Sequence, residues 1–180
     1  MSTESDLATV VREIEQHAAQ AGWDHPAQLF ALVPTADLIA REPALAAQLE
    51  HATGLTPVQQ DDVAGEELEE LLQRIVWPET VAGCAAVVER LVLPEGADED
   101  LPQDPAEAAA YAAGHPDRQE MRIVAAATRD GSSRCALRLR SHDEDDKVLV
   151  GPDLVPALLE LLHATLETPD QPAGMDGIDP

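Results

Sequence analysis

Apolar residues recur every three or four positions over residues 5–21, which predicts an amphipathic helix near the start of the chain. Ser5 is a suitable N-cap, Asp6 suits the positive end of the helix dipole, and Gly22 ends the helix. One face of this helix should therefore lie against a hydrophobic core. The apolar positions are Leu7, Val10, Val11, Ile14, Ala18 and Ala21.

Later stretches also have helical patterns, and prolines set several of their ends. Thr35 is expected to cap a helix that begins at Ala36, and Pro43 should open a new turn after it. An alanine-rich helix should begin at Pro105 and end at Gly114. The predicted helical spans are 36–41, 43–52, 66–75, 105–114 and 152–167.

Strands are predicted where short apolar runs are bounded by turn residues. The clearest are 28–33, a long central strand over 82–93, and a pair at 120–129 and 134–141 joined by Asp130-Gly131, a hairpin signal. Residues 56–62 are an ambiguous edge strand, and 148–150 a short one. The pattern predicts an α+β fold, in which an antiparallel sheet of about four to six strands carries terminal and intervening helices.

Residues 1–167 are expected to form a single domain, since no second-domain linker interrupts the pattern. Residues 168–180 contain three prolines and little apolar content, so we expect them to be a disordered C-terminal tail.

Acidic residues outnumber basic ones by 35 to 11, a formal charge of −24. A chain so acidic repels nucleic acids and anionic membranes at long range, so we expect neither as a partner. No signal-peptide pattern or membrane-length apolar run is present, and Cys84 and Cys135 form no CxxC motif. These features predict a cytoplasmic protein with two buried thiols.

Motifs for nucleophilic or phosphate chemistry are missing from the sequence, including G-x-S-x-G, the P-loop and G-x-G-x-x-G. A metal site is conceivable from two Glu–His pairs, Glu160 with His163 and Glu13 with His17, each on one of the terminal helices. The pairs could meet only if the two terminal helices packed side by side. Surface side chains that pair locally are the simpler interpretation. The sequence therefore predicts no catalytic residue, no metal and no cofactor.

The basic residues are concentrated in one segment. Residues 118–140 hold six of the eleven basic residues and only two acids, Glu120 and Asp130. Strand alternation places Arg134, Ala136, Arg138 and Arg140 on one face, and Arg122 could join Arg138 or Arg140 across the hairpin.

Two main hypotheses account for these arginines. In the first they pair with surrounding acids and only balance charge. In the second, Arg122, Arg138 and Arg140 form a contact surface for an anion or an acidic peptide, because guanidinium forks suit carboxylates and phosphates. A homodimer interface formed by the hairpin is a third.

Four segments resemble an uncharacterised protein family of actinobacteria that is known only by a locus name. They are FALVPTADLIAREPALAAQL (30–49), WPETVAGCAAVVERLVLP (77–94), DPAEAAAYAAGHPDR (104–118) and GPDLVPALLELLHATL (151–166). The resemblance covers residues 5–167 and implies a bacterial cytoplasmic protein, but no activity, cofactor or catalytic residue. The predicted architecture is also similar to that of bacterial secretion chaperones, which is an analogy of fold alone.

These observations favour a non-enzymatic cytoplasmic binding or adaptor protein, chaperone-like in character, whose partner is an unknown protein or a second copy. The alternative is an enzyme with a pocket of scattered polar residues and no recognisable motif.

Overall fold

The computed structural model describes residues 3–49, 54–60, 67–94 and 96–167. The helices are α1 (Thr3–Ala21), α2 (Thr35–Arg41), α3 (Leu68–Arg74), α4 (Pro105–Gly114) and α5 (Pro156–Leu166). The strands are β1 (Gln28–Pro34), β2 (Leu55–Gln59), β3 (Gly83–Val92), β4 (Gln119–Thr128), β5 (Ser133–Leu139) and β6 (Leu149–Gly151). The predicted disordered tail, 168–180, lies outside the described residues.

All six strands form one antiparallel sheet in the order β2-β1-β3-β4-β5-β6. This confirms the predicted α+β class, the central place of β3 and the edge position of the ambiguous strand β2. The β4–β5 hairpin turns at Gly131, whose φ of 90° is a left-handed conformation that glycine adopts without strain. The turn is closed by the Gly131 amide, which donates to the Thr128 carbonyl.

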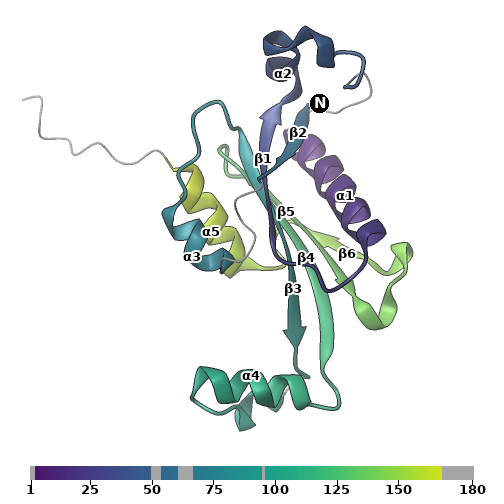
Figure 1. Cartoon of the computed structure of the whole chain (residues 1–180), viewed down its shortest axis with the longest axis vertical. Helices are drawn as coiled ribbons and strands as arrows, with labels where there is room; N and C mark the ends of the chain where they lie inside the picture. The colour runs from purple at the N-terminus through teal and green to yellow at the C-terminus, as the bar shows by residue number, and fades with distance from the viewer. Residues whose placement is uncertain (1–2, 50–53, 61–66, 95, 168–180) are drawn as a thin grey trace, which may run out of the picture.

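Helices cover both faces of the sheet (Figure 1). The apolar stripe of α1 packs on one face, where Leu7, Val10 and Ile14 are at most 3% exposed. Helices α3 and α5 cover the other face through residues such as Leu72 and Leu162. Because both faces are buried, the central strands are apolar at successive positions instead of alternating.

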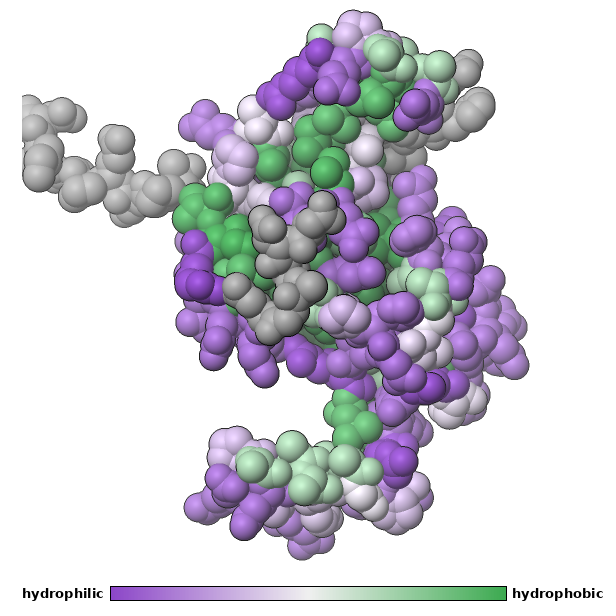
Figure 2. Space-filling model, in the orientation of Figure 1, coloured by the Kyte–Doolittle hydropathy of each residue, from purple (hydrophilic) through white to green (hydrophobic). Residues whose placement is uncertain are grey.

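Helix α4 lies apart from this three-layer body, at the far end of β3 and β4 (Figure 1). None of its described residues is buried, and Figure 2 shows its pale, weakly hydrophobic surface separated from the body. Asp104 caps its start by accepting from the Glu107 amide, and Pro105 occupies its first turn.

Thr35 is the first residue of α2 and not its cap, because Pro34 occupies the N-cap position. Two predicted helices differ more from the structure. The span 43–52 is only a short 3₁₀ helix, Pro43–Leu45, followed by turns; residues 50–52 lie outside the described part of the chain. Helix α5 begins at Pro156, not at 152. The residue before a proline is kept from the α region, and Val155 accordingly has φ −136° and ψ 73°. Pro156 is therefore the first residue of the helix and not an interior one.

Candidate functional site

The structure brings the three predicted arginines together at the α1 face of the sheet. Arg122 and Arg138 are directly opposite each other on β4 and β5, and both side chains are only 2% exposed. Arg140 follows the end of β5, and its side chain is 41% exposed. We call these three residues the arginine cluster.

Arg138 is the buried centre of an ion-pair network. Its Nε and Nη2 donate to the two carboxylate oxygens of Glu15 on α1, at 2.5 and 3.1 Å. Its Nη1 donates to Asp143 at 3.0 Å, and its Nη2 also donates to Asp145 at 2.7 Å. These contacts, the Glu15 hydrogen bond foremost, raise the pKa of Arg138 above its ordinary value. Arg138 therefore holds α1 to β5 and to the loop before β6.

Arg122 is held by an aromatic ring as well as by polar groups. Its guanidinium carbon lies 4.3 Å from the centroid of the Trp23 ring, and its Nη2 donates to the Gly22 carbonyl. Glu89 is 3.8 Å away, and burial lowers the pKa of Arg122. Its Nη1 is buried and has no hydrogen-bond partner among the described residues.

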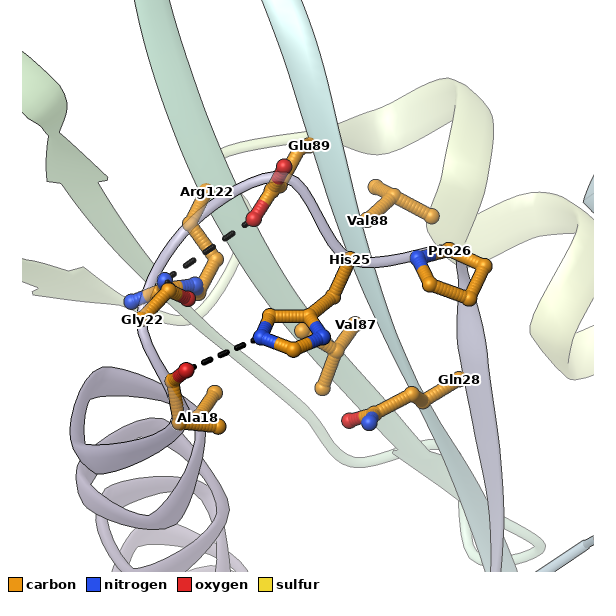
Figure 3. Close-up of a pocket in the computed structure, with 10 residues that line it drawn as sticks. Ala18, Gly22, His25, Pro26, Gln28, Val87, Val88, Glu89 and Arg122 are labelled. Carbon is orange, nitrogen blue, oxygen red and sulfur yellow. Dashed lines mark hydrogen bonds and ion pairs between the residues drawn. The ribbon is translucent and has the colours of Figure 1, made fainter.

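Figure 3 shows the small cavity beside Arg122, where Gly22, His25 and Glu89 surround the guanidinium at the end of α1. The His25 ring hydrogen-bonds to the carbonyl of Ala21, the last residue of α1. The cavity volume is about 10 Å³, roughly the space that one water molecule needs. It is too small for a substrate.

Arg140 completes the cluster at the surface. Its Nη1 donates to Asp24 at 2.9 Å and to Glu120 at 2.5 Å. These hydrogen bonds raise the pKa of Arg140, and the bond from Arg140 lowers the pKa of Asp24. All three arginines thus have carboxylates within 4 Å, as the charge-balance hypothesis expects. A contact between the cluster and a partner stays a prediction.

Trp23 also hydrogen-bonds to Asp143, which links the aromatic ring to the Arg138 network. The indole Nε1 donates to Asp143 at 3.0 Å, and this bond, ahead of the one from Arg138, lowers the pKa of Asp143. A carboxyl group with a lowered folded-state pKa stabilises the fold above its unfolded pKa. That contribution is lost as pH falls through the lowered value.

We therefore expect Asp143→Asn to reduce the free energy of unfolding at pH 7 by about 0.5–1 kcal/mol, a small value because the side chain is 43% exposed. The difference from wild type should shrink toward zero as pH falls below about 4. Urea melts of both proteins across pH 3–7 measure it. A difference that grows in acid would contradict the assignment.

A larger groove lies on the same face, between α1 and the β6 edge of the sheet. Helix α1 contributes Val11 and Arg12, β5 contributes Arg134 and Ala136, and β6 contributes Val150. Its volume is about 220 Å³. We call this the α1–β6 groove.

The groove contains both cations and carboxylates, but they are not paired with one another. Its carboxylates are Glu15 and Asp145, and both are bound to Arg138. Among the described residues, neither Arg12 nor Arg134 has an ion pair with a carboxylate. The Nε of Arg134 is buried and lacks a hydrogen-bond partner within the same residues. The groove therefore presents two guanidinium groups that an anion could bind.

The sequence interpretation missed this site although it named both of its arginines. Arg12 was counted as part of the polar face of the first helix, and Arg134 as one member of the hairpin face. Alternation correctly placed Arg134 on the face of Arg138, as the register with Ala126 and Arg122 shows. The approach of α1 to the edge of the sheet is a tertiary feature without a local signal.

The candidate metal half-sites do not meet. Helix α1, with Glu13 and His17, packs on one face of the sheet, and α5, with Glu160 and His163, packs on the other. In the described part of the chain, no three His, Cys, Asp or Glu side chains are grouped to hold a metal ion.

Both thiols are fully buried, on the face that α5 covers. Cys84 contacts Thr165 and the Leu162 carbonyl, and burial raises the pKa of its thiol to about 11. Burial also raises the pKa of Cys135. The thiolate is the reactive form, so both cysteines are chemically protected in the native state.

We expect Ellman's reagent at pH 8 to modify the native protein about a hundredfold more slowly than the protein in urea. Rapid native labelling of Cys135, located by mass spectrometry, would contradict its burial. Cys135→Ser should then abolish that labelling.

The chain belongs to the PPA1309-like protein family, whose model matches residues 7–167. This is a locus-name family of unknown function, which confirms the uncharacterised family predicted from the sequence. The comparison with curated proteins and the comparison with solved structures gave no match. Among the described residues, no helix has the length and apolar character needed to cross a membrane.

Proposed function

We propose that this member of the PPA1309-like family is a non-enzymatic cytoplasmic binding protein that takes a carboxylate group of its ligand into the α1–β6 groove. The observation that carries the proposal is the pair Arg12 and Arg134. Both line the groove, and within the described residues neither has a carboxylate partner.

Binding would satisfy a group that the fold leaves unsatisfied. A buried donor without a partner costs about 1–3 kcal/mol, and the Nε of Arg134 is such a donor. A carboxylate oxygen at that atom would form a charge-assisted hydrogen bond, which is about twice as strong as a neutral one. Arg12, on the other wall of the groove, could bind the second oxygen.

The charge of the whole molecule favours a carboxylate over a phosphate. A phosphate monoester carries about 1.5–2 negative charges at neutral pH, and a carboxylate carries one. With a net charge of −24, the long-range repulsion grows with the charge of the ligand. Val11, Ala136 and Val150 add apolar surface beside the charged residues of the groove, which suits a ligand with an apolar part beside its carboxylate.

The same geometry supports binding over catalysis. The carboxylates of the groove, Glu15 and Asp145, accept hydrogen bonds from Arg138, so neither is held as a free general base. The two buried free thiols support the cytoplasmic assignment, because a reducing compartment keeps such cysteines unpaired.

The test is a binding titration with N-acetylglycine, a small amide whose only charged group is its carboxylate, followed by backbone amide NMR. We expect shifts concentrated at Ala8, Arg12, Ala136 and Val150, and none of comparable size with N-acetylglycinamide. Arg134→Gln should weaken binding at least about tenfold, since hydrogen bonds to charged groups are worth about 1.5–3 kcal/mol.

The matched control is Arg118→Gln, which removes the same charge near α4, where Arg118 donates to the His115 carbonyl. It should bind N-acetylglycine as wild type does. No site-specific response of the wild-type protein, or an Arg134→Gln variant that binds equally well, would overturn the proposal.

A further inference from the structure

Strand β6 is an edge of the sheet and forms one side of the α1–β6 groove. It pairs with β5 on one side and is last in the strand order (Figure 1). An edge strand leaves backbone N–H and C=O groups unpaired along its outer side. Leu149 and Val150 are 58% and 47% exposed, so apolar side chains accompany these backbone groups.

The register places one side chain of β6 inside the groove. Val150 is opposite Ala136, so both lie on the face of the sheet that α1 covers. Arg134 is two residues before Ala136 on the same strand and shares this face. The groove is therefore bounded by a helix, by two arginines and by a strand edge with no further strand beside it among the described residues, and its lining includes Ala136 and Val150.

We propose that the ligand is the C-terminal segment of a partner protein, extended along the outer edge of β6 with its terminal carboxylate bound by Arg12 and Arg134. This inference rests on the proposed function. Strand addition supplies main-chain hydrogen bonds, the side chains of the added segment fill the apolar part of the groove, and the arginines recognise the chain end.

Charge favours this occupant over a second copy of the chain. The residues just before β6 are acidic and exposed: Asp143, Glu144, Asp145 and Asp146. Asp153, just after β6, is exposed as well. Pairing of two β6 edges would bring these acids of both copies together, and like charges at close range are unfavourable. A single terminal carboxylate meets the arginines without that repulsion.

The experiment uses the full chain and three bead-bound libraries of degenerate hexapeptides attached through their N-termini. One library ends in a free carboxylate and the second in an amide. The third ends in a carboxylate but has a fully N-methylated backbone, which cannot pair as a strand. We expect at least tenfold greater retention on the first library than on either of the others. Arg134→Gln should lose this retention, and Arg118→Gln should keep it.

The outcomes separate this inference from the proposed function. If N-acetylglycine binds at the groove but the three libraries retain the protein equally, or none retains it, the carboxylate site stands and the peptide proposal is overturned. If neither N-acetylglycine nor any library binds, both are overturned. A dimer that Leu149→Lys dissociates, with no retention on the first library, would assign the edge to a second copy and overturn the peptide proposal.

Discussion

Replacing Arg138 by Met should lower the free energy of unfolding by about 3–5 kcal/mol. Arg138 is 2% exposed and binds Glu15, whose side chain is 5% exposed, along with the more exposed Asp143 and Asp145. The substitution leaves the Glu15 carboxylate buried without its partner, and an uncompensated buried charge is strongly destabilising. Urea denaturation at pH 7 measures the loss.

Two controls make the Arg138 result specific. The double variant Glu15→Leu with Arg138→Met removes both buried charges and should recover most of the stability. Arg90→Met breaks an exposed pair with Glu69, in which the side chains are 43% and 40% exposed, and should cost about 0–1 kcal/mol. A loss at Arg138 no greater than at Arg90 would show that the network contributes little.

Arg129→Met should lower the free energy of unfolding by about 2–3 kcal/mol. Arg129 is just after β4, and its guanidinium donates to the Val81 and Pro78 carbonyls at 2.7 and 2.9 Å, to the Trp77 carbonyl at 3.0 Å, and to the Leu166 carbonyl. It joins the loop before β3 to the end of α5. Met keeps much of the apolar stem but removes every donor.

The variant Arg129→Lys tests whether the shape of the guanidinium group matters in addition to its charge. An ammonium group keeps the charge but cannot reproduce the planar fork that reaches several carbonyls at once, so less than half of the loss should be recovered. Hydrogen exchange should show faster opening at the end of α5 in the Met variant, around Leu166. Unchanged stability and unchanged exchange would mean that water replaces these donors at no cost.

Most of the fold could be predicted because its signals are local. The helical period of α1, the turn at Gly131 and the proline at the start of α4 each specify one element through short-range sterics and burial. The antiparallel pairing of β4 and β5 followed from the length of their connection. The start of α5 was predicted wrongly because Pro156 keeps Val155 out of the helical conformation. The helix predicted over 43–52 is also wrong, since the structure has only the 3₁₀ helix Pro43–Leu45 in the described part of that span, and the apolar pattern gave no sign of that.

The site could be predicted only in part. Alternation along β5 put Arg134 and Arg138 on one face, and register brought Arg122 beside Arg138. Arg138 is paired with Glu15, which is 123 residues away along the chain. The choice of arginines that pair with carboxylates therefore depends on how α1 crosses the sheet. No local pattern encodes that crossing. Sequence reasoning therefore named the arginines that the fold pairs with carboxylates. It did not single out Arg12 and Arg134, which line the groove without a carboxylate partner among the described residues.

The most direct test of the carboxylate site is the NMR signal of the Arg134 Nε–Hε group, a buried donor in the groove that lacks a partner among the described residues. Saturating N-acetylglycine should shift this signal and slow its exchange with water, because the Nε–H gains a charge-assisted hydrogen bond. The Nε–Hε signal of Arg138, which already donates to Glu15, should stay in place. An Arg134 signal that does not move, or that moves equally with N-acetylglycinamide, would contradict carboxylate binding in the groove.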